Sequence, residues 1–197
     1  TDFRELCVIV ANLGEDGKIN SSSNRCGIAS NYCISAPGTR IVSPWHTTSS
    51  VYYYATGTSM AAPMVSGGLA LIKQKHSSLT NQQVVDRLFA TAVDHDVYSQ
   101  SSIYGHGLMD IGAATSAIGS LQTFSGPVNN LDSSNSLYTE LNQNFYFSSG
   151  AFNSSLILAL KDKTMEVYDS FDRANFSVYL DGFFKNDHIQ NRNSIDN

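Results

Sequence analysis

The stretch that decides the fold is residues 57–68, Gly-Thr-Ser-Met-Ala-Ala-Pro-Met-Val-Ser-Gly-Gly. A glycine turn leads into small and apolar residues, and the helical spacing continues from residue 59 to residue 75. Pro63 falls near the first turn, where a missing backbone N–H costs least. Apolar residues wrap most of the way round this segment, which predicts a buried central helix. Gly67 and Gly68 lower helix propensity, so we expect the helix to approach a sheet closely there.

Ser59 opens this helix, and Thr58 is the expected cap. The backbone N–H of Ser59 then belongs to the unpaired donors of the first turn, where the helix dipole favours negative charge. One residue would therefore supply both an attacking oxygen and part of an oxyanion site. A Thr-Ser cap on an ordinary core helix is the alternative interpretation.

The flanking segments predict an α/β fold with a mostly parallel sheet. Residues 6–11, Leu-Cys-Val-Ile-Val-Ala, have the β-branched apolar character of a buried strand. Residues 33–36 predict a second strand, which Pro37 and Gly38 end. A second helix is expected after Thr80, because a glutamine three residues later completes a capping box.

The chain changes character after Gly119, where serine and asparagine become frequent. We expect two parts: residues 1–119 form the main domain, and residues 120–197 form a polar linker with a β-leaning extension. Short strands of the extension are predicted at residues 156–160, 166–168 and 176–184.

Composition and charge give no signal for a nucleic-acid partner or for a membrane-spanning helix. The net charge is -5 and only 15% of residues are charged. No Lys/Arg cluster is present that would bind a phosphate backbone, so no nucleic-acid partner is expected. No apolar run reaches the length of a membrane span.

The three cysteines raise a question of pairing. Cys26 and Cys33 flank a short polar loop that is long enough for a disulfide, although two buried free thiols are the alternative. Cys7 lies inside an apolar run and is expected in the core.

Several motifs resemble those of one family. Residues 57–63 resemble the serine signature of the subtilisin-like serine peptidases, or subtilases, although Met64 departs from the histidine frequent at that position. Residues 35–38 resemble the Ala-Pro-Gly turn that precedes the serine loop, and residues 104–110 resemble the Tyr-Gly-x-Gly turn that closes the domain. The order and spacing agree with the family over residues 5–118.

The resemblance implies a serine endopeptidase that hydrolyses peptide bonds through an acyl-enzyme on Ser59. The family's triad runs Asp, His, Ser, with an oxyanion asparagine before the serine, yet the short segment before Ser59 contains neither the histidine motif nor the asparagine turn. We therefore expect the missing N-terminal half of the domain, upstream of Thr1, as a partner beside the peptide substrate, and expect this chain alone to be inactive. The histidines present are interpreted as structural: His46, His76, His95, His106 and His188.

Signals for a metal are weak. No His/Cys spacing fits a zinc site. Asp94 and Asp96 offer carboxylates to calcium, but paired loop acids are usually solvated. The resemblance implies that no cofactor is required, and it allows calcium in the complete domain.

Residues 167–178 resemble the junction region of autotransporter subtilases, and the Cys26–Cys33 loop fits that subgroup. In those proteins a later β-barrel anchors the peptidase in a bacterial outer membrane. The resemblance therefore implies a secreted or cell-surface protein whose membrane link runs only through such a barrel.

Two other functions stay open. The chain is also consistent with a non-catalytic binding or stalk module on a subtilase-like scaffold. Another serine hydrolase, of esterase type, would use a carboxylate and a histidine after the serine, such as Asp94 and His106. Pro63 and the Ala-Pro-Gly turn argue against that alternative.

Overall fold

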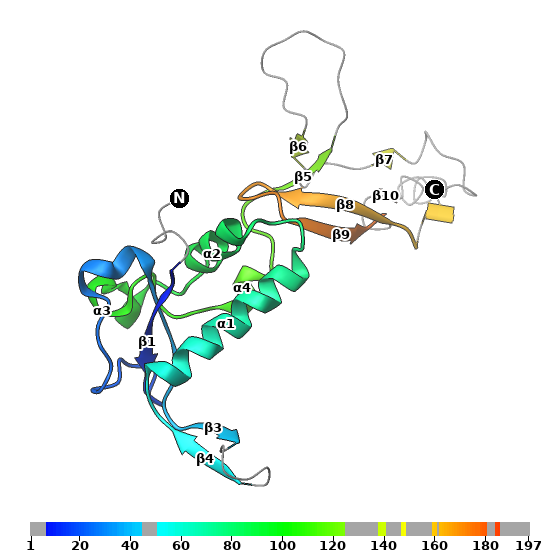
Figure 1. Ribbon diagram of the computed structural model, residues 1–197. Coiled ribbons are helices and arrows are strands. Elements are labelled where there is room, and N and C mark those ends of the chain that lie inside the picture. Colours follow the sequence, from blue (N-terminus) through cyan, green and yellow to red (C-terminus); the bar gives the residue numbers. More distant parts are fainter. Residues whose placement is uncertain are drawn as a thin grey trace, which may run out of the picture. The chain divides into compact units, whose positions relative to one another are not determined.

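The computed structural model divides the chain into two compact units, Thr1–Ser116 and Ala117–Asn197 (Figure 1). The expected division between residues 119 and 120 stays a prediction. The structure describes residues 7–44, 51–124, 138–140, 147–148, 159–160, 162–180 and 184–185.

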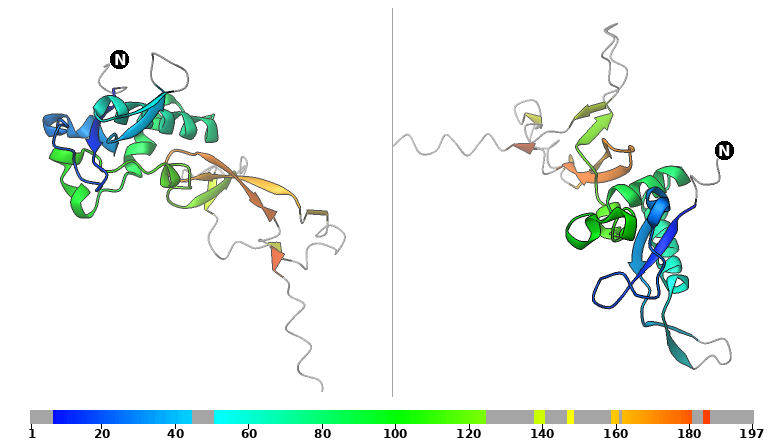
Figure 2. Two further views of the ribbon diagram at one scale, coloured as in Figure 1. Left: turned by 90° about the horizontal axis from the view of Figure 1, so that it is seen from below. Right: turned by 90° about the vertical axis from the view of Figure 1, so that its left-hand side faces the viewer.

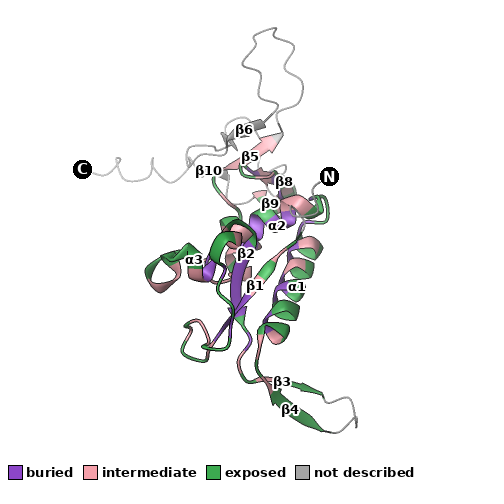
Figure 3. Ribbon diagram, turned by 60° about the vertical axis from the view of Figure 1, so that its left-hand side comes forward, coloured by how far each residue is buried: buried purple, intermediate pink, exposed green. Residues whose placement is uncertain are grey.

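The first unit is built on two parallel strands, β1 (Ile9–Leu13) and β2 (Cys33–Pro37), which pair along their whole length. Helix α1 (Thr58–Lys75) packs against both strands (Figure 3). The core where they meet is lined by small and branched side chains, which allow the helix to lie close to the strands. Its buried members include Ile34, Ala36, Ala61, Val65 and Ile72, whereas Ala11 packs with Cys26 and Cys33.

A hairpin and several short helices complete the first unit. Strands β3 (Ile41–Pro44) and β4 (Tyr52–Ala55) form an antiparallel hairpin. Helix α2 (Asn81–Ala90) begins at the predicted capping box, in which the Thr80 side chain accepts from the backbone of Gln83 and the Gln83 side chain accepts in return. The remaining elements are η2 (Gly27–Tyr32), η3 (Asp96–Ser99), α3 (Ser101–Tyr104) and α4 (Ile111–Ala114).

The described part of the second unit consists mainly of strands (Figure 2). A four-stranded antiparallel sheet has the order β6-β5-β8-β9, and β7 and β10 form a short parallel pair. The strand predicted at residues 166–168 is confirmed inside β8. The prediction at residues 156–160 is wrong where the chain is described, because residues 159–160 are helical. The bounds are β5 (Leu121–Phe124), β6 (Tyr138–Glu140), β7 (Phe147–Ser148), β8 (Thr164–Asp169), β9 (Asn175–Tyr179) and β10 (Phe184–Lys185).

The α/β class is confirmed, but the sheets differ from the expected mostly parallel sheet. In the described residues of the first unit only β1 and β2 pair in parallel over several residues. β3 ends at Pro44 and β4 begins at Tyr52, which is too short a connection for the crossover that parallel strands need. The hairpin is therefore antiparallel.

Helix α1 also differs from the prediction, because it is buried along one face rather than all round (Figure 3). Met64 is 43% exposed and Leu71 is 54% exposed. Two strands offer the helix only one surface, so the opposite apolar side chains stay uncovered. Gly68 approaches the side chains of Met109 and Ile111 rather than the sheet, and Gly67 faces open space.

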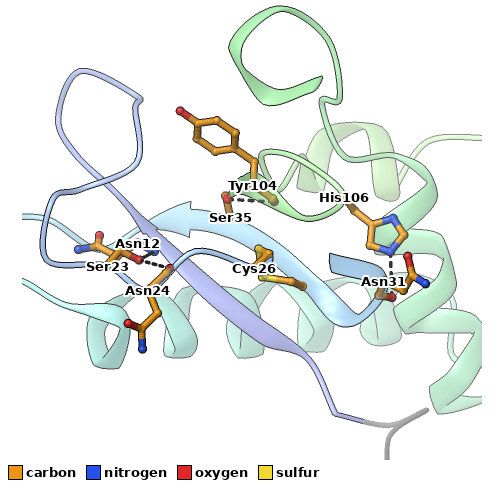
Figure 4. Close-up of a disulfide and its surroundings, with 9 residues drawn as sticks. Asn12, Ser23, Asn24, Cys26, Asn31, Ser35, Tyr104 and His106 are labelled. Atoms are coloured by element: carbon orange, nitrogen blue, oxygen red, sulfur yellow. Dashed lines mark hydrogen bonds between the residues drawn. A yellow bond between two sulfur atoms is a disulfide. The ribbon is translucent and has the colours of Figure 1, made fainter. Parts of the chain in front are cut away.

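The cysteines divide as one pair and one free thiol. Cys26 and Cys33 form a disulfide with their Cα atoms 5.8 Å apart, which confirms the predicted pairing (Figure 4). Cys7 is exposed, so the prediction of a core position is wrong. It precedes β1, where few side chains of the described chain cover it. No helix of the described residues combines the length and apolar character needed to cross a membrane.

Candidate active site

Ser59 lies in the first turn of α1, two residues after Gly57. Gly57 is the N-cap of the helix, with φ 154° and ψ 171°. This conformation is essentially restricted to glycine. The Gly57 carbonyl accepts from the backbone N–H groups of Met60 (3.0 Å) and Ala61 (3.2 Å). The predicted Thr58 cap is wrong: the helix already includes Thr58, and no side chain caps it.

The surroundings of Ser59 leave both of its polar groups available. The residue is exposed, and among the described residues neither its hydroxyl nor its backbone N–H has a hydrogen-bond partner. The first N–H groups of a helix lack partners within the helix, and they lie at its positive end. The arrangement therefore offers an attacking oxygen beside a donor for a developing negative charge.

The end of β2 holds the turn that presents Ser59. The Gly57 N–H donates to the Gly38 carbonyl at 2.9 Å, and the Arg40 N–H donates to the Thr56 hydroxyl at 2.9 Å. Gly38 also has no room for a side chain, since an added Cβ would lie 2.7 Å from the Gly57 carbonyl oxygen. The Ala-Pro-Gly turn recognised in the sequence thus lies against the serine turn.

The closing turn of residues 104–110 is bonded to the other edge of β2 (Figure 4). Ser35 donates its backbone N–H to the Gly107 carbonyl (2.8 Å) and accepts from the Met109 N–H (2.9 Å). The Ser35 hydroxyl donates to the Tyr104 carbonyl at 3.0 Å. Gly105 has φ 68° and contacts the Cys33 carbonyl so closely that a Cβ would collide with it. This turn fixes the strand that carries Gly38.

Burial raises the pKa of Tyr98 above its usual value, with smaller contributions from Tyr104 and Asp16. Its hydroxyl donates to the Gly17 carbonyl at 2.9 Å, and its ring lies edge-on to that of Tyr104. Tyr98 therefore connects the loop of residues 14–19 to the closing turn of residues 104–110.

No described histidine shares a hydrogen bond with Ser59. The His95 Nδ1 pairs with an Asp96 carboxylate oxygen at 2.9 Å in exposed positions, and His76 is buried where α1 ends. His106 stacks on the Phe89 ring with centroids 4.2 Å apart. His46 and His188 lie outside the described residues.

The residues of the esterase alternative do not form a dyad. The His106 Nε2 is 3.1 Å from the Asn31 carbonyl oxygen (Figure 4), and no hydrogen bond joins it to Asp94 within the described chain. Neither residue is hydrogen-bonded to Ser59. Over the same residues, no group of three or more His, Cys, Asp or Glu side chains is placed to hold a metal ion.

Sequence reasoning missed one polar residue close to the serine turn. Asn12 is 0% exposed within β1, and the Thr39 hydroxyl donates to its Oδ1 at 3.3 Å. An asparagine directly after a run of apolar residues was the available signal, but it equally suits the first residue of a polar loop.

Comparisons with known proteins point to one family. A family model described as the subtilase family matches residues 7–107. Subtilisin NAT of Bacillus subtilis subsp. natto is 41% identical over 101 residues, which cover 50% of this chain and 25% of that protein. The neisserial autotransporter lipoprotein NalP of Neisseria meningitidis serogroup B (strain MC58) is 36% identical over 103 residues, covering 51% and 9%. The solved structure of the prenylagaramide maturation protease PagA has a TM-score of 0.49 and 25% identity, covering 55% and 40%. The chain thus spans a quarter or less of the length of these two curated relatives.

Proposed function

This chain belongs to the subtilase family, and on that premise we propose that the whole protein is a serine endopeptidase with Ser59 as its nucleophile. The observation that carries the proposal is the exposed Ser59 hydroxyl beside a backbone N–H without a partner among the described residues. Both groups lie at the positive end of α1, behind a residue whose backbone conformation only glycine readily adopts.

In the proposed reaction, the Ser59 oxygen bonds to the carbonyl carbon of the scissile peptide while a general base takes the hydroxyl proton. The Ser59 N–H helps to hold the oxyanion. The C–N bond then breaks, the amine leaves with the proton, and water hydrolyses the remaining ester. These steps use no cofactor; we propose that any calcium in the complete protein is structural.

We propose that the base, the orienting carboxylate and the oxyanion asparagine come from an N-terminal half of the domain that is not in this sequence. Two observations support this. No described histidine is hydrogen-bonded to Ser59. The outer face of α1 leaves Met64 and Leu71 exposed, and apolar helix faces of this kind are normally covered.

We further propose that the protein is secreted or displayed on a bacterial cell surface. The Cys26–Cys33 disulfide supports an oxidising compartment, where such bonds persist. The similarity to a protein named an autotransporter lipoprotein supports a bacterial surface protein of that kind.

A fluorophosphonate probe tests the proposed nucleophile in the longest natural chain that contains this sequence. We expect covalent labelling of the wild type and none of Ser59→Ala. Ser66→Ala is the matched control, because Ser66 is also exposed on α1 but bonds to the Ala62 carbonyl at 3.1 Å, so it should label normally. The 197-residue chain alone should not label above background.

The competing candidate is a non-catalytic binding module, which the lack of a described base near Ser59 favours. If the long chain is folded and unlabelled, this candidate replaces the peptidase. If Ser59→Ala labels as strongly as the wild type, the reactive residue lies elsewhere.

A further inference from the structure

We propose that Asn12 is a positioning residue that holds the Ser59 turn through Gly38. This inference rests on the proposed function, because it assigns a role within the same site. Asn12 is fully buried near the carboxyl end of β1, opposite Ala36 of β2. Functional groups in α/β folds gather at the carboxyl ends of parallel strands, which is where Asn12 lies.

A chain of side-chain hydrogen bonds leads from a surface loop to Asn12. The Asn20 amide donates to the Thr39 hydroxyl at 3.0 Å, and that hydroxyl donates to the Asn12 Oδ1 at 3.3 Å. Thr39 directly follows Gly38, whose carbonyl accepts the Gly57 N–H at 2.9 Å. Two hydrogen bonds, joined by the peptide bond between Gly38 and Thr39, therefore connect Asn12 to Gly57, the N-cap of α1. Ser59 lies two residues after Gly57.

Asn12 and the first turn of α1 also pack against the same residue, Gly38. A Cβ added to Gly38 would lie 2.7 Å from the Asn12 Oδ1, 2.7 Å from the Gly57 carbonyl oxygen and 2.8 Å from the Ala61 Cβ. The carboxamide and the first turn of α1 thus contact Gly38 around one small space. A change in the shape of residue 12 would move Gly38, and with it the acceptor that orients Gly57.

Stability alone does not account for an asparagine at this position. The Asn12 Nδ2 is buried and donates to no described residue. A buried donor without an acceptor destabilises the folded state, whereas an apolar side chain of similar size would avoid that cost. An amide at this cost beside the serine turn is the pattern expected where position matters more than stability.

The test compares labelling kinetics in the full natural chain. Asn12→Leu should lower the maximal fluorophosphonate labelling rate about 10- to 100-fold, because a displaced nucleophile loses its alignment. The probe concentration at half-maximal rate and the unfolding midpoint should not fall. Thr39→Val, which removes the hydroxyl and its bonds to both Asn12 and Asn20, should lower the rate in the same direction.

Ser35→Ala is the matched control. Ser35 is also fully buried, on the neighbouring strand. Alanine removes only its hydroxyl bond to the Tyr104 carbonyl and keeps the backbone bonds that hold the closing turn to β2. Its labelling rate should stay within about twofold of the wild type. Wild-type kinetics in folded Asn12→Leu, or an equal loss in Ser35→Ala, would overturn the positioning role.

Hydrogen exchange separates this inference from the proposed function. In the same full chain, Asn12→Leu should speed exchange of the Gly57 amide at least tenfold, since its acceptor on Gly38 moves, while Ser35→Ala should not. If the wild type is not labelled, the proposed function fails, and the exchange result still decides whether Asn12 holds the turn. Unchanged Gly57 exchange in Asn12→Leu would overturn the inference.

Discussion

Gly57 and Gly38 share one hydrogen bond, yet the structure requires glycine at each for a different reason, and substitution by alanine should expose the difference. At Gly57 an added Cβ meets nothing closer than 3.8 Å, so the cost is the backbone conformation itself. Such strain costs about 1–3 kcal/mol, reduced by about 0.4–1 kcal/mol from the less flexible unfolded chain. We expect Gly57→Ala to lower the free energy of unfolding by about 1–2 kcal/mol.

At Gly38 the backbone conformation is ordinary, and the cost is a collision. An added Cβ would lie within 2.8 Å of three atoms, one of which belongs to the Asn12 side chain. Overpacking of this kind costs typically about 1–3 kcal/mol, and three simultaneous contacts place Gly38→Ala near the upper value. Shortening Asn12 to alanine should relieve part of the collision.

A double-mutant cycle measured by urea unfolding of the 197-residue chain tests this reasoning. In the Asn12→Ala background, Gly38→Ala should cost about 1 kcal/mol less than in the wild type, while the cost of Gly57→Ala should not change. Gly67→Ala, which faces open space on α1, should raise stability by up to about 1 kcal/mol and controls for helix propensity. An equal cost of Gly38→Ala in both backgrounds would refute the steric explanation.

Two further predictions concern the rest of the first unit. Replacing both Cys26 and Cys33 with alanine should lower the free energy of unfolding by about 2.5 kcal/mol, which is the entropy of closing a loop with a sequence separation of 7. Urea unfolding with and without a reductant measures this loss, and an unchanged urea midpoint would contradict the prediction. Because burial raises the folded-state pKa of Tyr98, its unfolded form ionises first as the pH rises above about 10, so stability should fall from there toward the folded-state pKa. Tyr98→Phe should flatten that part of the stability profile; an identical slope would assign the loss to other groups.

The sequence predicted the elements whose signals are local. The capping box of Thr80 and Gln83 lies where the spacing placed it, and the Cys26–Cys33 pair lies within the reach of a short loop. β1 was predicted from a run of β-branched apolar residues, and β2 from a short segment that Pro37 and Gly38 end. In each case the deciding contacts lie within a few residues of one another.

Features that depend on distant contacts were not predicted. The apolar pattern of α1 indicated burial on all sides, but a pattern states which side chains avoid water and not which partner is present to cover them. The N-cap moved from Thr58 to Gly57 because the carbonyl of Gly38, on a separate segment of the chain, accepts from the Gly57 N–H. The position of Asn12 beside the serine turn was not predicted for the same reason, since its neighbours Gly38 and Thr39 follow the end of β2.

The position of the disulfide also decides which thiol stays single. Cys33 follows Cys26 at a sequence separation of 7, whereas Cys7 lies much farther from Cys26 along the chain. The probability that two ends of a flexible chain meet falls with roughly the 3/2 power of their separation, so Cys26 encounters Cys33 about four times as often as it encounters Cys7. The nearer thiols are therefore expected to pair first, which leaves Cys7 without a partner among the three cysteines.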